Sequence, residues 1–318
     1  TLVQRYYRLK AKLLGLPNFT LSDIYAPLPD TESKYSYEEA KSLVLDSFQG
    51  FDPEFYELAK SIFDENHVDV PVSAKKRGGA YCSSSVPGIT PFVFLNFLGR
   101  ARDVSTIAHE LGHAVHACLS SDQPLWSYHA ILPLCETASV FSEMILMDHM
   151  KKQDLSPKLR LAMLSEKLED IFATSHRQNM FSRFEMAMHG RLSEGILSAD
   201  ELCDLYKKEL EIMFGDSVEI PEHYQWEWSS IPHMLDVPFY VYSYNFGNLL
   251  TMALYQEYCE QGEAFIPKLK TFLSAGSSDA PVALTEALGV DIHDRKFWEK
   301  SMLAIEAMLD EWESLLPN

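Results

Sequence analysis

A histidine, a glutamate and a second histidine occur at the spacing H-E-x-x-H in the segment HELGH, His109 to His113. Apolar residues recur every three or four positions over Val104–Ser120, which predicts a helix through this motif. Residues i and i+4 of a helix project from one face, so both imidazoles can bind one Zn²⁺. Zinc lowers the pKa of a bound water from about 16 towards about 7, and Glu110 can then take the proton.

A pair of histidines on a solvated helix face is the ordinary alternative. The flanks of the motif are apolar, namely Ile107, Ala108, Leu111, Ala114 and Val115. We therefore expect the helix to be buried. A buried His-Glu-His cluster without a metal would carry a desolvation cost, which favours the zinc interpretation.

A catalytic zinc site needs a third protein ligand and an open position. Candidates downstream are His129, Glu136 and Glu143. His129 follows a short polar loop that gives no reason for it to reach the metal. Both glutamates lie on the next predicted helix, Leu134–Lys152, two turns apart on one face, so spacing alone does not choose between them.

The elements that must position these groups are mostly helical. Helical periodicity covers Tyr37–Phe48, Pro53–Asn66, Val104–Ser120, Leu134–Lys152, Pro157–Ser193, Ala199–Phe214, Phe239–Gln261, Phe265–Ser274, Ala280–Leu288 and Lys296–Leu315, after an amphipathic Thr1–Gly15. Lys76–Leu98 differs, because paired glycines, Pro87-Gly88 and the β-prone run Pro91–Phe97 predict a hairpin. We expect one mainly α domain over 1–318, with a small sheet beside the active-site helix.

Composition narrows the classes of protein. The 318 residues are 47% hydrophobic with a net charge of −19, which excludes global disorder and disfavours nucleic acid as a partner. No apolar run is long enough to predict a membrane span, and no signal peptide is visible. Five scattered cysteines without a CxxC pair favour a reducing compartment.

The motif and its surroundings resemble the oligoendopeptidase F and thimet oligopeptidase family of zinc peptidases. The match begins with HELGHAVH at 109–116, ETAS at 136–139 and Glu143. Further matching segments lie on both sides of the motif. Before it are RYYRLKAKLLG, SDIYAPL, KRGGAYC and PFVFLNF, and after it are HRQNMFSRFE, IPHMLDVPFYVYSY and LSAGSSDAP. The resemblance implies a zincin-like helical catalytic domain that holds one Zn²⁺ on His109, His113 and Glu136. Glu143 would then support one of the zinc ligands without binding the metal itself, and His116 would have a structural or supporting role.

A second set of residues lies in His233–Tyr244. Aromatic clusters such as Tyr240, Tyr242 and Tyr244 are more typical of a core than of a catalytic site. The resemblance nevertheless implies that His233 and Tyr240, with Tyr244 next, bind the substrate carbonyl and the developing oxyanion. Tyr242 could equally face the site, because spacing alone does not fix which tyrosine does.

The hairpin could also contact substrate. In zinc peptidases with an edge strand beside this helix, the peptide adds as a further strand. Gly78 and Gly79 would permit close backbone approach, and Ala80 and Tyr81 would touch the peptide. An ordinary buried hairpin is the alternative.

The sequence thus predicts a zinc metalloendopeptidase that hydrolyses short, unstructured oligopeptides. The alternatives are a non-catalytic, zinc-stabilised helical module and a related carboxypeptidase or dipeptidase. An intact Glu110 speaks against the first alternative, because a structural zinc site needs no free carboxylate. Family members are typically about twice this length, so the resemblance implies partnership with an N-terminal half or a second copy. It also implies a cytoplasmic location.

Overall fold

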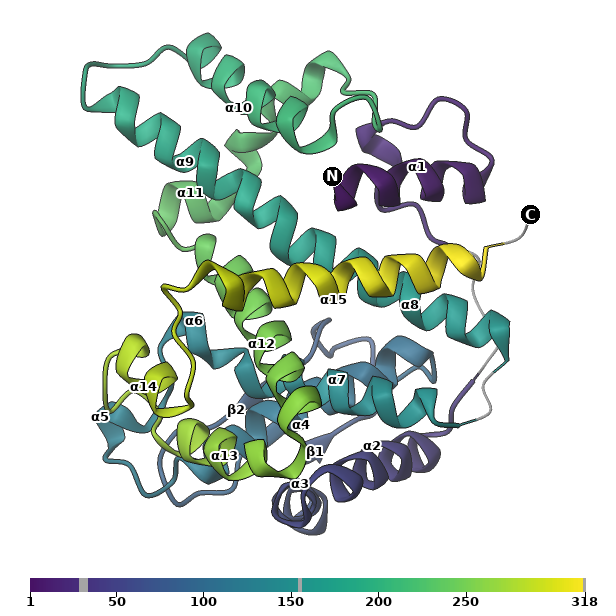
Figure 1. Ribbon diagram of the computed structural model, residues 1–318, viewed down its shortest axis with the longest axis vertical. Coiled ribbons are helices and arrows are strands. Elements are labelled where there is room, and N and C mark those ends of the chain that lie inside the picture. Colours follow the sequence, from purple (N-terminus) through teal and green to yellow (C-terminus); the bar gives the residue numbers. More distant parts are fainter. Residues whose placement is uncertain (29–33, 154–155, 317–318) are drawn as a thin grey trace. The chain divides into compact units, whose positions relative to one another are not determined.

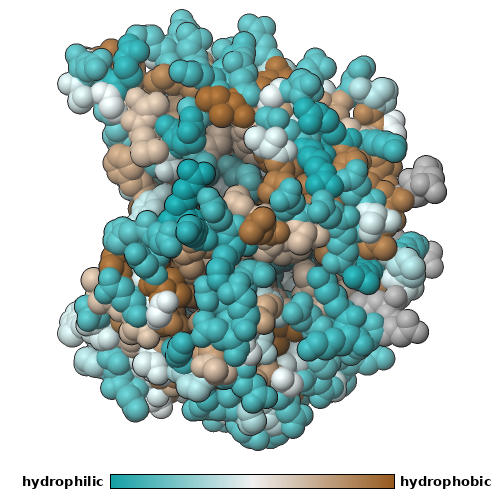
Figure 2. Space-filling view, viewed as in Figure 1, coloured by the Kyte–Doolittle hydropathy of each residue, from teal (hydrophilic) through white to brown (hydrophobic). Residues whose placement is uncertain are grey.

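The computed structural model describes residues 1–28, 34–153 and 156–316, which are mostly helical with one small sheet (Figure 1). This confirms the predicted fold class. Hydrophilic residues cover most of the face in Figure 2, as expected for a chain of net charge −19. None of the helices in the described residues is long and apolar enough to cross a membrane.

The chain divides into two compact units. Unit 1 comprises Thr1–Thr31, Leu164–Asn248 and Ile305–Asn318, and unit 2 comprises Glu32–Met163 and Leu249–Ala304. The HELGH motif belongs to unit 2, whereas His233 and the tyrosines near it belong to unit 1. The expectation of a single domain stays a prediction.

Unit 2 is built around the helix that carries HELGH. Its elements are α2 (Tyr37–Phe51), α3 (Pro53–Asp64), β1 (Val68–Asp69), β2 (Tyr81–Ser83), β3 (Phe92–Phe94), α4 (Ala101–Leu119), α5 (Leu125–Tyr128), α6 (Leu132–Cys135), α7 (Thr137–Lys151), η4 (Gly262–Phe265), α13 (Ile266–Ser274) and α14 (Pro281–Ala287). Helices α8 (Pro157–Ile171), α12 (Tyr242–Gln261) and α15 (Arg295–Ser314) contribute residues to both units. Ser36 and Asp52 cap α2 and α3, because their side chains accept hydrogen bonds from backbone N–H groups in the first turn of each helix.

The small sheet lies beside α4. Strands β2 and β3 pair antiparallel, with Cys82 opposite Val93, which confirms the hairpin predicted for Lys76–Leu98. Strand β1 was not predicted and pairs parallel to β3, so the order among the described residues is β1-β3-β2. Both β2 and β3 contact α4. The outer edge of β2 is therefore an edge of the sheet next to the motif helix.

Helix α4 is buried and packs mainly against α7 (Figure 1). All the apolar flanks of the motif that were predicted to be buried are buried. The two helices meet at Gly112, where an added Cβ would lie 2.6 Å from both the Ala138 carbonyl oxygen and the Ser139 Cα. No side chain fits between these backbones, so Gly112 sets the distance between α4 and α7.

The core of unit 1 contains large aromatic side chains. Its elements are α1 (Leu2–Leu14), η1 (Leu21–Asp23), η2 (Phe172–Arg177), α9 (Gln178–Leu192), α10 (Ala199–Phe214), η3 (Glu222–Ser230) and α11 (Pro232–Asp236), with parts of α8, α12 and α15. Tyr6 packs against Phe172 and Trp312, with ring centroids 4.8 and 5.3 Å away. The Trp312 indole donates a hydrogen bond to Ser165 Oγ at 2.6 Å.

Two predicted helices of this region differ from the structure. The stretch predicted as one helix over Pro157–Ser193 contains a π-helical segment, η2, between α8 and α9. The helix predicted over Phe239–Gln261 begins only at Tyr242, because Val237–Tyr240 forms a turn. Each of these segments is bound by a distant residue of unit 1: Asn245 accepts a hydrogen bond from Ser175 of η2, and Glu185 accepts one from the Phe239 N–H of the turn.

We expect Gly112→Ala to lower the free energy of unfolding by about 1–3 kcal/mol, because the new methyl group overlaps backbone that has no freedom to rotate away. Gly50→Ala is the matched control, since an added Cβ there meets nothing within 4 Å. It should raise stability by up to about 1 kcal/mol through helix propensity. Urea denaturation of both variants measures this, and equal effects would contradict the close approach of α4 and α7.

Burial lowers the pKa of His176 from 6.5 to about 4, and its Nδ1 has no hydrogen-bond partner. In the unfolded chain His176 therefore binds a proton as the pH falls below 6.5, whereas in the folded chain it binds one only near pH 4. Stability from this group is complete above pH 6.5 and falls by about 2–3 kcal/mol towards pH 4.

We expect His176→Gln to remove that part of the pH dependence in equilibrium unfolding between pH 4 and 7. His223→Gln, at an exposed histidine, should leave the profile unchanged. An identical profile for His176→Gln and the parent chain would contradict the lowered pKa of this imidazole.

Candidate functional site

The two histidines of the motif share one face of α4. Their rings lie 4.9 Å apart between centroids and nearly perpendicular, at 83°. The start of α4 is fixed by Asp103, whose carboxylate accepts the backbone N–H groups of Leu98 and Arg100 at 2.7 and 3.0 Å. The i, i+4 placement inferred from the sequence is the placement observed.

Glu136 lies at a junction and not in the middle of a helix. The predicted helix Leu134–Lys152 is wrong in this respect, because α6 ends at Cys135 and α7 begins at Thr137. Glu136 Oε2 is 3.4 Å from His109 Nε2 and 3.4 Å from His113 Nε2. Ser139 Oγ donates a hydrogen bond to the same Oε2 at 2.7 Å, which orients the carboxylate.

These three residues form a group that could hold a metal ion. Their ligand atoms all lie within 4.8 Å of one another. Zinc bonds of about 2.0–2.1 Å in a tetrahedron place ligand atoms roughly 3.4 Å apart, close to the two His–Glu distances. Two imidazole nitrogens and one carboxylate oxygen are also a donor set that zinc accepts, so the residues fit this ion.

Glu143 contacts the far side of the first histidine. Its Oε1 is 2.6 Å from His109 Nδ1. With Nδ1–H donating to this carboxylate, Nε2 is left as the acceptor that faces Glu136. The structure thus places the two glutamates on opposite ring nitrogens of His109, a distinction that their shared spacing on a helix did not provide.

Charge in this group favours a cation. Although burial opposes it, hydrogen bonds to Glu136 and Glu143 raise the pKa of His109 well above its ordinary value. For Glu136, burial alone would raise the pKa of the carboxyl group. Hydrogen bonds and attraction to the two imidazoles outweigh burial and hold this pKa well below its usual range. Positive charge at the ring nitrogens, from a proton or from a metal ion, is therefore stabilised here.

Glu110 lies beside the group without belonging to it. Its side chain is only 5% exposed, and Oε2 is buried without a hydrogen-bond partner. Burial raises the pKa of this carboxyl group. A buried carboxylate oxygen with no partner costs free energy in a folded chain, so its presence needs a structural or functional reason.

The other candidate histidines of unit 2 are not in the group. Among the described residues, neither His116 nor His129 lies in a cluster of metal-ligating atoms. His116 is buried on α4, and burial lowers its pKa to about 4, so the ring is neutral near pH 7. This agrees with a structural role for His116.

In unit 1, His233 packs with two of the three candidate tyrosines. Its ring is stacked on Tyr240 at 5.1 Å and 24° and meets Tyr244 edge-on at 6.0 Å. Tyr240 and Tyr244 also touch each other, with centroids 5.4 Å apart. Tyr242, at the start of α12, is 47% exposed.

The glycine-rich segment before β2 is anchored to the end of β3. Asn96 Nδ2 donates to the carbonyl oxygens of Arg77 and Gly79, both at 2.9 Å. Gly79 has φ +86°, and an added Cβ at Gly78 or Gly79 would meet nothing within 4 Å. Tyr81 follows at 45% exposure and stacks on Phe94 at 4.8 Å. The segment is therefore held in place while one side stays open.

Sequence reasoning missed two features. Ser139 was only part of a matched segment, although the E-x-x-S spacing could have indicated its hydrogen bond to Glu136. Glu185 was also only part of a matched segment, and it accepts the Phe239 backbone N–H at 2.5 Å. No local pattern in the sequence indicates that Glu185 contacts Phe239.

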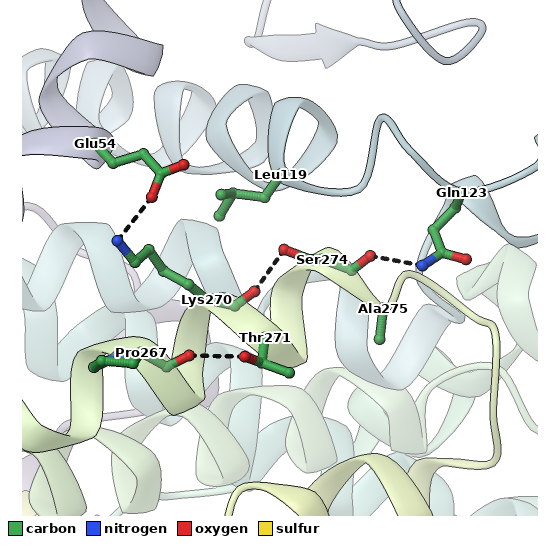
Figure 3. A pocket seen from close by; sticks show the side chains of 8 residues that line it. All are labelled: Glu54, Leu119, Gln123, Pro267, Lys270, Thr271, Ser274 and Ala275. Carbon is green, nitrogen blue, oxygen red and sulfur yellow. Dashed lines mark hydrogen bonds and ion pairs between the residues drawn. The ribbon is translucent and has the colours of Figure 1, made fainter.

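A pocket of about 550 Å³ lies elsewhere in unit 2 (Figure 3). It is lined by Glu54, Leu119, Gln123, Pro267, Lys270, Thr271, Ser274 and Ala275. Lys270 is paired with Glu54 at 2.7 Å, and Gln123 donates to the Ser274 carbonyl oxygen at 3.0 Å. The pocket contains none of the predicted site residues and gives no reason to place chemistry there.

Comparison with known proteins places this arrangement in a family. The chain is 32% identical over 318 residues to "Oligopeptidase PepF" of Bacillus subtilis (strain 168), covering 99% of this chain and 47% of that protein. It is 30% identical to "Oligoendopeptidase F, chromosomal" of Lactococcus lactis subsp. cremoris, covering 99% and 52%. The chain spans about half the length of these relatives.

Solved structures also resemble this chain over nearly its whole length. A protein of known crystal structure from Chlamydophila abortus superposes with a TM-score of 0.88 at 32% identity, over 99% of this chain and 53% of that one. The crystal structure of oligoendopeptidase-F from Enterococcus faecium gives 0.73 at 26% identity, over 99% and 50%. The model of peptidase family M3 matches residues 25–303. This chain belongs to peptidase family M3.

Proposed function

We propose that the chain is the catalytic part of a zinc-dependent endopeptidase that hydrolyses short, unstructured oligopeptides. The observation that carries the proposal is the convergence of His109 Nε2, His113 Nε2 and Glu136 Oε2. The next residue after His109 is Glu110, which has a buried carboxylate oxygen without a partner. Membership of peptidase family M3 supports it.

His109, His113 and Glu136 would hold the zinc. When bound, the ion would supply Lewis acidity, which makes a nearby water more acidic and polarises the scissile carbonyl. Glu110 takes the proton from the attacking water and later gives it to the leaving amine. Its burial suits this role, because the raised pKa of a buried carboxyl group makes it a stronger base than an exposed one.

Two neighbours of the ligands hold them in position. Ser139 fixes the Glu136 carboxylate, and Glu143 fixes the orientation and tautomer of His109. Because these two hydrogen bonds hold the ligand atoms close to the spacing that zinc requires, little rearrangement is needed when the metal binds.

His233 and Tyr240, with Tyr244 next, are proposed to donate to the carbonyl oxygen as it gains negative charge. Support comes from the family resemblance and from their contact with one another. A preorganised O–H or N–H donor stabilises a developing oxyanion without reorganisation. Exposure of Tyr242 and its lack of a place in this contact favour Tyr240 and Tyr244 over it.

The free edge of β2 is the proposed binding strand for peptide. An extended peptide that pairs with Tyr81–Ser83 would gain backbone hydrogen bonds without regard to its side chains. The open side of Gly78 and Gly79 permits close backbone approach, and Ala80 and Tyr81 are the expected contacts. Such pairing requires an unfolded substrate.

Partners and location follow from the same proposal. Oligopeptides are the expected substrates, and an N-terminal half or a second copy of the chain is the expected protein partner. We place the protein in the cytoplasm, in keeping with five scattered cysteines.

We expect Glu110→Gln to lower kcat for a quenched fluorogenic nonapeptide by roughly 10²–10⁴-fold, because the amide accepts no proton. The purified variant should still bind about one zinc ion per chain, since Glu110 is not a ligand. Metal analysis and steady-state kinetics check this, with 1,10-phenanthroline inhibition of the parent chain as the metal-removal control. Stoichiometric zinc with no turnover in the parent chain would support the non-catalytic alternative instead.

We expect Glu143→Gln to weaken zinc binding by about 10- to 100-fold, because the amide supports the His109 ring less strongly than a carboxylate does. Competition with a fluorescent chelator measures the Kd. Glu54→Gln is the matched control, since this carboxylate pairs with Lys270 elsewhere in unit 2. Equal affinity in Glu143→Gln and the parent chain would contradict the orienting role.

A further inference from the structure

The backbone just before α12 contains a strained turn. Tyr240 N–H donates to the Val237 carbonyl oxygen at 3.2 Å, Pro238 is the second residue of the turn, and Phe239 has φ +61°. This is the pattern of a type II turn, whose third position takes glycine because side chains disfavour positive φ. A bulky residue at this φ is held there by its surroundings.

Helix α9 supplies those surroundings. Glu185, 1% exposed, accepts the Phe239 backbone N–H at 2.5 Å. His189, one turn further along α9, packs its ring on the Phe239 ring with centroids 4.7 Å apart. Residues i and i+4 share a helix face, so one face of α9 binds both the backbone and the side chain of Phe239.

The other end of the segment is bound from the same helical stretch. Ser175 Oγ, in η2, donates to Asn245 Oδ1 at 2.5 Å. Tyr240 and Tyr244 thus lie between two anchors, at Phe239 and at Asn245. Both tyrosines pack on His233. The stretch of chain that carries the two predicted tyrosine donors, Tyr240 and Tyr244, is therefore fixed at each end.

We propose that Glu185 is a positioning residue for the peptidase reaction. By accepting the Phe239 N–H it holds the turn at positive φ, and this holds the next residue, Tyr240, stacked on His233. Without an acceptor, the turn relaxes towards negative φ and Tyr240 leaves His233. The inference rests on the proposed function for the catalytic consequence, although the positioning itself is a property of unit 1 alone.

Three variants of the full chain test the mechanism. Glu185→Met keeps the size of the side chain but removes the acceptor. Glu185→Gln keeps a carbonyl oxygen that can accept the same N–H. Phe239→Gly in the Glu185→Met background makes positive φ easy again, so the turn no longer needs its acceptor.

We expect Glu185→Met to lower kcat by about 10- to 100-fold with a smaller change in KM, as for a displaced group that acts on the transition state. Glu185→Gln should retain most of kcat, and adding Phe239→Gly to Glu185→Met should recover part of it. Glu209→Met is the control, because it removes another buried carboxylate of unit 1, one that binds Arg183. It should leave kcat unchanged at a temperature where all variants are folded.

Nuclear magnetic resonance separates positioning from function. In the chain labelled with ¹⁵N-phenylalanine, the Phe239 amide, assigned as the signal missing from Phe239→Leu, should move upfield in Glu185→Met and much less in Glu185→Gln. The His233 ring protons, assigned with His233→Gln, should lose the ring-current shift from Tyr240 only in Glu185→Met.

The outcomes are distinct. Unchanged Phe239 and His233 signals in Glu185→Met overturn the positioning, whatever the kinetics. Equal losses of kcat in Glu185→Met and Glu209→Met also overturn it, because a general loss of packing would then explain both. If the parent chain cleaves no peptide, the proposed function fails, and the two signals still decide whether Glu185 holds the turn.

Discussion

Contact between the backbones of α4 and α7 at Gly112 is the constraint on which the candidate metal centre depends. With no Cβ at this position, α4 lies directly against Ala138 and Ser139. Glu136 and Glu143 flank that contact on the chain, one before it and one after it. Each carboxylate can then reach a different nitrogen of the same imidazole of α4. A larger residue between the helices would move both carboxylates away together.

The same close approach creates an electrostatic problem that a cation would resolve. It gathers carboxylates and imidazoles in a partly buried group, where each charge loses solvation. The protein meets part of this cost with hydrogen bonds, from Ser139 to Glu136 and between Glu143 and His109. Glu110 receives no such bond on Oε2. The three residues that could hold a metal ion are thus supported by hydrogen bonds, whereas Glu110, next to His109 in the chain, keeps one buried oxygen without a partner.

Local patterns were enough to predict much of unit 2. The buried helix through HELGH and the hairpin of Lys76–Leu98 follow from periodicity and turn residues, both of which act over a few positions. The placement of Glu136 does not follow, because a helical pattern runs through Leu134–Lys152 without showing that the helix restarts at Thr137. Spacing left the two glutamates equivalent. The family resemblance singled out Glu136, and the packing of α7 on α4 shows one glutamate at each ring nitrogen of His109.

Unit 1 shows the opposite limit of local information. The segment VPFY has proline where a type II turn accepts it, yet phenylalanine where such a turn favours glycine, so local preference alone argues against the turn. The strain of a bulky residue at positive φ costs on the order of 1–3 kcal/mol. Its compensation comes from Glu185, 54 positions earlier in the chain. Glycine would form the turn at no such cost, but it would lack the ring that packs on His189. Phenylalanine therefore joins the turn to α9 through both backbone and side chain, which makes the position of Tyr240 depend on α9.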